Sequence, residues 1–120
     1  MNLRVLHASL ASVTAAAGVA LVLSGAWSAA HRSAPSIRLV LLVRRAALIT
    51  VLLALLVGAV LFLEGRRPHV PLHYLYAFVA LATVPLAATL AARQPRRGGI
   101  YHAGAGVVLL LMCFRLASTG

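Results

Sequence analysis

The sequence predicts an all-α integral membrane protein, a single compact bundle of four transmembrane helices with both termini on the same side of the bilayer. Its 120 residues are 62% hydrophobic and only 10% charged, whereas soluble domains carry about 25% charged residues. All eleven basic residues are arginines that flank long apolar runs, and Glu64 is the one acid. A basic excess can indicate nucleic-acid binding, but this arrangement excludes a soluble protein that binds nucleic acid.

Four stretches of the chain are free of Arg, Asp and Glu. A helix needs about 20 apolar residues to cross the hydrocarbon core of a bilayer, which is about 30 Å thick. The first and third stretches reach this length, and snorkelling of the flanking arginines extends the two shorter ones. None of them shows the period-two alternation of a membrane strand. The predicted helices are Leu6–Ala30, Ala46–Leu63, Leu72–Ala92 and Ile100–Ser118.

The first predicted helix follows Arg4, and its apolar stretch exceeds the roughly 7–15 residues of the hydrophobic region of a signal peptide. We therefore expect it to be a membrane span. The segment Ser33–Ser36, which contains Pro35, ends this helix. The next segment, Ile37–Val43, lies between arginines, and we expect it to lie along the membrane interface before the second helix begins at Ala46.

The remaining connections are short. Gly65–Pro68 ends the second helix, and Gln94–Gly99 separates the third helix from the fourth. Pro85 lies inside the third helix, where it removes one backbone hydrogen bond and is expected to cause a kink. No segment is left for a soluble domain.

The arginines also predict the orientation of the bundle. We call side A the end that holds both termini, and side B the end that holds the first and third connections. Side B has seven arginines and side A has four, which favours the cytoplasm for side B and the outside for both termini. Arginine without lysine, beside abundant alanine and leucine, is typical of a GC-rich genome, so we expect the inner (plasma) membrane of a bacterium.

Helices associate in lipid through small residues, because no hydrophobic force acts between them there. Each predicted helix offers such residues near one face. They are Ala11, Thr14, Gly18 and Gly25 in the first helix, Ala47, Thr50, Ala54 and Gly58 in the second, Ala77, Ala80, Thr83 and Ala87 in the third, and Gly104 and Gly106 in the fourth.

Ionisable residues inside a membrane are costly and therefore informative about function. His7, Glu64, His73 and Arg115 come from four different predicted helices and lie at a similar depth on side A. Glu64 is the only acid that Arg115 could pair with, so we expect a structural ion pair between these two residues.

Histidines at equal depth also suggest a haem. Two imidazoles from facing helices can hold one haem iron, and His7 with His73 on side A, or His31 with His102 on side B, meet the depth condition. The segment Arg96–Gly106, in which His102 is followed by small residues, resembles the histidine-then-glycine helix starts of membrane b-type cytochromes, which implies a haem b ligand. The candidate haem ligands are His7, His73 and His102. A transition-metal site is an alternative, built from His7, His69, His73 and Glu64.

The sequence contains no aspartate, no phosphate-binding loop, no cysteine pair and no zinc-protease motif, so we expect no enzyme. The first hypothesis is an accessory subunit or assembly factor of a larger membrane complex, such as a respiratory complex, that needs no cofactor. The alternative is a haem b-binding protein that transfers electrons or reacts with quinone. The third is a small oligomeric transporter.

Overall fold

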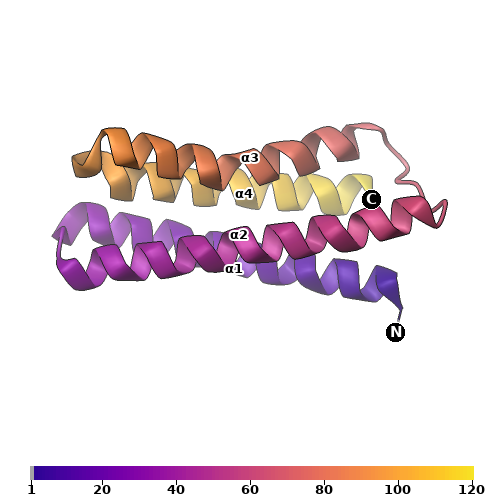
Figure 1. Cartoon of the computed structure of the whole chain (residues 1–120), viewed down its shortest axis with the longest axis horizontal. Coiled ribbons are helices and arrows are strands. Elements are labelled where there is room, and N and C mark those ends of the chain that lie inside the picture. The colour runs from indigo at the N-terminus through magenta and orange to yellow at the C-terminus, as the bar shows by residue number, and fades with distance from the viewer. Residues whose placement is uncertain (1) are drawn as a thin grey trace.

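The computed structural model describes residues 2–120, which form four long helices in an antiparallel bundle (Figure 1). No strand occurs in this part of the chain. The helices follow the long axis of a molecule measuring 47 × 25 × 19 Å, and both chain ends lie at the same end of the bundle. The elements are α1 (Leu3–His31), α2 (Ala34–Leu63), α3 (Leu72–Arg93), the 3-10 turn η1 (Pro95–Arg97) and α4 (Gly98–Thr119).

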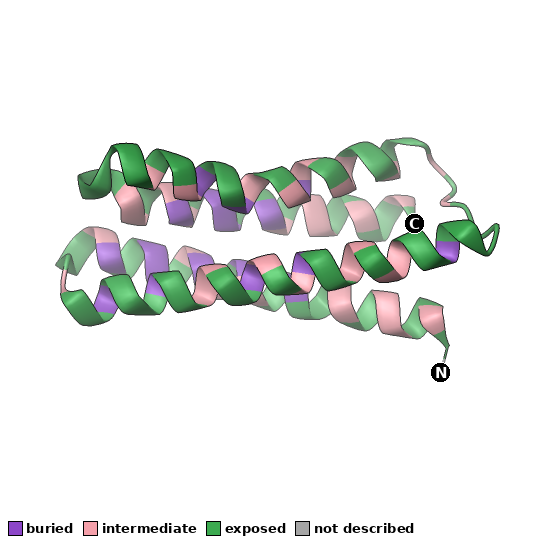
Figure 2. Ribbon diagram, viewed as in Figure 1, coloured by how far each residue is buried: buried purple, intermediate pink, exposed green. Residues whose placement is uncertain are grey.

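All four long helices are long and apolar enough to cross a membrane, which indicates a multi-pass membrane protein. Buried residues face the centre of the bundle, and the outer surface is exposed (Figure 2). Large apolar side chains on that surface, such as Leu23, Leu56 and Phe78, would be in contact with lipid. The prediction of four helices long and apolar enough to span a membrane is therefore confirmed, while their insertion in the bilayer and the sidedness of the termini stay predictions.

The start of α2 differs from the prediction. The segment expected along the interface is helical, and α2 runs without a break from Ala34 over 30 residues. Ser33 and Ser36 form a reciprocal capping box, in which each side-chain oxygen accepts a hydrogen bond from the backbone N–H of the other residue. Pro35 lies in the first turn, where its missing N–H costs nothing. Arginine is a good helix former, so the helix begins before Arg44 and Arg45 and includes both of them.

The helices surround two apolar clusters. Ala47, Val51, Ala80, Val84 and Leu109 form one cluster between α2, α3 and α4. Leu21, Ala87 and Ala105 form the second cluster, between α1, α3 and α4. α1 packs against both α2 and α4, and α4 also packs against α3, whereas α2 and α3 make fewer contacts.

The closest packing in the bundle joins α1 to α4 at glycines. A Cβ atom on Gly106 would lie 2.6 Å from the carbonyl oxygen of Gly18, and one on Gly99 would lie 2.6 Å from the carbonyl oxygen of Gly25. Each helix places its two glycines seven residues apart, which puts both on one face. The backbones of α1 and α4 are therefore in direct contact, as the small residues of membrane helices permit.

Gly104 does not share this role, although the sequence predicts that it packs against a helix as Gly106 does. A Cβ atom on Gly104 would meet nothing within 4 Å. Gly104 lies two residues from Gly106 and therefore points to the opposite side of α4, away from α1.

These two glycines give a matched test of the α1–α4 contact. We expect Gly106→Ala to lower the free energy of unfolding by about 1–3 kcal/mol, because the added methyl group meets backbone atoms that cannot move aside. We expect Gly104→Ala to be neutral or to stabilise the bundle by up to about 1 kcal/mol, because alanine favours the helix. Reversible unfolding in mixed micelles measures both values, and an equal effect of the two substitutions would contradict the packing.

Candidate functional site

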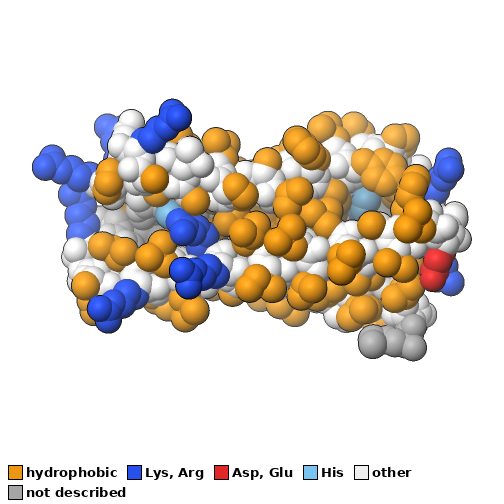
Figure 3. Space-filling view, viewed as in Figure 1, with side chains coloured by type: hydrophobic (Ala, Val, Ile, Leu, Met, Phe, Trp, Pro, Cys, Tyr) orange, Lys and Arg blue, Asp and Glu red, His pale blue; other side chains and the backbone are white. Residues whose placement is uncertain are grey.

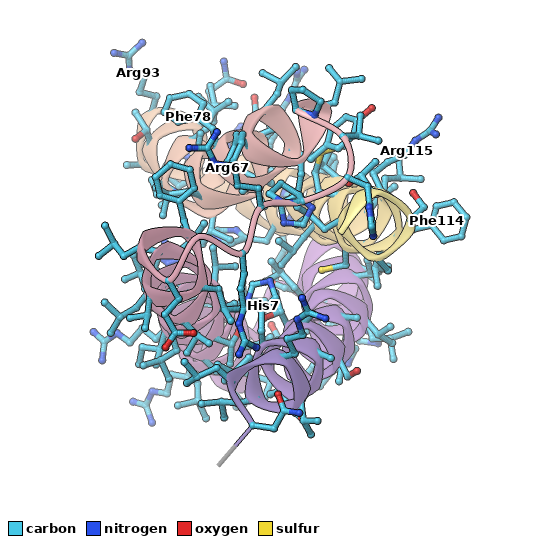
Figure 4. The ribbon with its side chains drawn as sticks, turned by 90° about the vertical axis from the view of Figure 1, so that its right-hand side faces the viewer. His7, Arg67, Phe78, Arg93, Phe114 and Arg115 are labelled. Atoms are coloured by element: carbon cyan, nitrogen blue, oxygen red, sulfur yellow. The ribbon has the colours of Figure 1, made fainter. Side chains whose placement is uncertain are left out.

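The structure brings His7 and His73 together on side A. His7 lies in the second turn of α1, and His73 is the second residue of α3. Their ring centroids are 6.4 Å apart, and the ring planes are tilted by 45°. Seen from side A, His7 points into the space between the four helices (Figure 4). Of the candidate haem ligands, these two are the ones that face each other.

Hydrogen bonds define the protonation of both rings. Nδ1 of His7 lies 3.0 Å from the carbonyl oxygen of Ala54 in α2, and only an N–H can bond to a carbonyl. Nδ1 of His73 lies 3.2 Å from the hydroxyl oxygen of Thr119 in α4. That hydroxyl donates to the carbonyl of Arg115, so its oxygen accepts from His73. Both neutral rings therefore carry the proton on Nδ1 and have a lone pair on Nε2.

Gly58 of α2 creates the space for His7. A Cβ atom at Gly58 would lie 3.2 Å from Cε1 of His7, tighter than an ordinary contact. Gly58 was expected to pack against another helix, and the structure shows that it packs against a histidine side chain of α1. The ring is held between this glycine and the Ala54 carbonyl one turn earlier on α2.

The ion pair expected between Glu64 and Arg115 is not formed. Nε of Arg66 lies 3.5 Å from Oε2 of Glu64, with both side chains nearly half exposed, and this is the one ion pair within residues 2–120. Glu64 ends α2 and finds its partner two residues along the chain. Arg115 is exposed and points away from the bundle (Figure 4). α2 and α4 make few contacts, and Arg115 lies on the outer face of α4, so equal depth does not bring these residues together.

The four-residue metal site is not assembled either. His69 lies exposed in the connection between α2 and α3, and Glu64 is paired with Arg66. In the described part of the chain, no three side chains of His, Cys, Asp or Glu are placed to share a metal ion. The histidine pair on side A therefore consists of His7 and His73 alone.

His102 on side B has a different environment. It is only 2% exposed, and its Nδ1 donates to the carbonyl oxygen of Gly98 at 2.7 Å. Its Nε2 therefore has a lone pair, which accepts a hydrogen bond from Nη1 of Arg44 in α2 at 3.4 Å. With both ring nitrogens engaged, His102 has no free nitrogen for a haem iron. His31 is exposed, and its Nδ1 bonds to the carbonyl of Trp27 on its own helix.

The contact of Arg44 with His102 is not predicted from the sequence. Arg44 was assigned to the connection before the second helix and used only to predict the orientation of the bundle. The early start of α2 places Arg44 inside a helix that passes α4, and so brings its side chain to His102. Buried serines, namely Ser24 and Ser28 of α1 and Ser36 of α2, make the side B half of the interior polar as well. Their irregular spacing in the sequence does not predict that this half of the interior is polar.

Comparisons with protein-family models, with curated proteins and with solved structures give no match in any of the three. The functions of the two histidine sites and of the outer surface are therefore inferred from their own geometry.

The hydrogen bonds predict unusual histidine tautomers. We expect ¹⁵N NMR of the histidine-labelled protein in micelles, under conditions where the rings are neutral, to show His7, His73 and His102 protonated on Nδ1. Exposed His69 serves as the reference, because free imidazole side chains favour the Nε2 proton. Thr119→Val should change the signal of His73 alone, and Ser118→Ala should change none. Protonation of His7 and His73 on Nε2 would contradict the proposed geometry.

Proposed function

We propose that this chain is a helical subunit that acts inside the bilayer by holding another membrane protein, as an accessory subunit or assembly factor of a larger membrane complex. The observation that supports this proposal best is the outward face of α4, where Gly104 lies exposed without a neighbour.

Glycine inside a helix costs about 1 kcal/mol relative to alanine. Gly99 and Gly106 offset this cost by the close contact with α1, whereas Gly104 makes no such contact within the bundle. Membrane helices associate where small residues let backbones approach closely. Gly104 is therefore the place where a helix of another protein can lie against the α4 backbone.

Two apolar grooves flank this face. One has a volume of about 370 Å³, lies between α1 and α4, and includes Val107 in its lining. The other has a volume of about 330 Å³, lies between α3 and α4, and includes Val108. Val107 and Val108 are three and four residues after Gly104, so they share its face of the helix. A helix lying over Gly104 could place its side chains in both grooves.

The proposal predicts that a bulky residue at Gly104 releases the chain from its assembly. After gentle solubilisation, we expect the wild-type 12.5 kDa chain to migrate on a native gel in a larger complex with other subunits. Gly104→Leu should shift it to the size of the free chain. The control is Ala59→Leu, at an exposed position of α2, which should leave the complex intact.

Equal behaviour of the two variants, or a wild-type chain that migrates alone, would reject the proposal. A larger species that contains only this chain would favour a homo-oligomer over an accessory subunit.

The geometry of His7 and His73 supports a second function, the binding of a metal centre such as haem b for electron transfer. One ion bound by both rings, with metal–nitrogen bonds of about 2.0–2.1 Å, would separate the ring centroids by roughly 5–6 Å, with the larger value when the two bonds are in line. The observed separation is 6.4 Å. Each Nδ1–H is also held by an oxygen acceptor, as is usual for histidines that bind a metal.

This second function has a spectroscopic test. A haem held by the two rings should give the purified protein a strong α-band in its reduced-minus-oxidised spectrum. His7→Ala and His73→Ala should each abolish that band, and His31→Ala should keep it. A colourless protein that still assembles with its partner subunits would exclude haem binding.

A further inference from the structure

Most of the positive charge lies at side B, where it meets no acid. Seven of the eleven arginines belong to this end, and the only acid of the chain, Glu64, lies at side A. Figure 3 shows arginine side chains gathered at this end, around a hollow between α2 and α3 in which histidine atoms are visible. The seven residues are Arg32, Arg38, Arg44, Arg45, Arg93, Arg96 and Arg97.

Arg44 differs from its neighbours because it is directed into the bundle. It is half-buried, and its guanidinium group donates to His102, whereas Arg45 is exposed. His102 cannot serve as a counter-ion, because its Nδ1–H is used by the Gly98 carbonyl and its Nε2 is a neutral acceptor. The imidazole therefore positions the guanidinium group and leaves its charge uncompensated.

A guanidinium group has five N–H donors, and the hydrogen bond to His102 uses one of them. No acidic side chain within residues 2–120 is placed to neutralise this charge, since the single carboxylate is held by Arg66. A partly buried charge is costly unless an opposite charge meets it. The remaining donors of Arg44 are therefore suited to an anion from outside the chain.

The depth of Arg44 indicates which anion is available. The apolar run Ala46–Leu63 begins directly after Arg45, and at 1.5 Å per residue it is about 27 Å long. This length is close to the hydrocarbon thickness of about 30 Å. A hydrocarbon layer that covers this run would end near Arg44 and would place it at the level of the headgroups, where phospholipid phosphates are found.

We propose that Arg44, positioned by His102, binds the phosphate of an anionic phospholipid at side B. The planar fork of a guanidinium group matches two phosphate oxygens, and basic pockets between transmembrane helices are suited to anionic headgroups. The surrounding arginines raise the local concentration of such lipids, and Arg44 supplies the specific contact. This site is independent of the outer face of α4 and of the His7–His73 pair.

Adjacent arginines allow a matched test with the whole chain. Lipid binding to the detergent-purified protein would be measured by native mass spectrometry, with phosphatidylglycerol and phosphatidylcholine as probes. We expect a tightly bound phosphatidylglycerol on the wild-type chain and on Arg45→Gln. Arg44→Gln should weaken this binding at least tenfold, although both variants lose one charge. Arg44→Lys, which keeps the charge without the fork, should lie between them.

Several outcomes would overturn the proposal. They are equal binding of the two lipids by the wild-type chain, equal losses in Arg44→Gln and Arg45→Gln, and full binding by Arg44→Gln. Inorganic phosphate at the same concentration distinguishes a lipid site from a general anion site. Phosphate would displace the lipid from a general anion site but not from a lipid site. If Arg44→Gln does not fold, the Arg44→Lys variant decides, because unchanged affinity there would show that charge alone attracts the lipid.

Discussion

The contact between the backbones of α1 and α4 is the constraint on which the rest of the bundle depends. The two helices touch at two pairs of glycines, Gly18 with Gly106 and Gly25 with Gly99. The glycines of each helix are seven residues apart, which is about two helical turns. Lipid supplies no hydrophobic force between helices, so dense packing of this kind has to hold them together. The contact sets how far α4 is shifted along α1. That shift places His102 beside Arg44 of α2 at one end, and Thr119 beside His73 of α3 at the other.

Histidines at the two ends of the interior make the same kind of hydrogen bond but have different neighbours. At both ends an imidazole donates its Nδ1–H to an oxygen atom and presents the lone pair of Nε2. On side A, the rings of His7 and His73 lie 6.4 Å apart between centroids, close enough for one metal ion to reach both. On side B, the lone pair meets the guanidinium group of Arg44, which it orients for an anion. Between them lies an apolar core without ionisable groups.

Apolar run length predicts the four helices. Equal depth suggests two histidine pairs, of which the structure brings together His7 with His73 and not His31 with His102. Sequence reasoning placed the start of α2 too late, because it treated arginines as a helix boundary, whereas the capping box of Ser33 and Ser36 decides where the helix begins. Depth alone does not tell which way a side chain points. For that reason Arg115 and Gly104 were expected inside, although they face outward. Arg44 was overlooked because its partner lies 58 residues away on another helix.

Solid-state NMR in a lipid bilayer tests the α1–α4 contact most directly, because it measures the backbone approach without changing any residue. With glycine labelled at the carbonyl and α carbons, the structure predicts short-range cross-peaks between Gly18 and Gly106 and between Gly25 and Gly99. Gly104 should give no cross-peak to any glycine of α1. Absence of the two predicted cross-peaks in a folded sample, or a contact between Gly104 and α1, would contradict the register that organises both ends of the bundle.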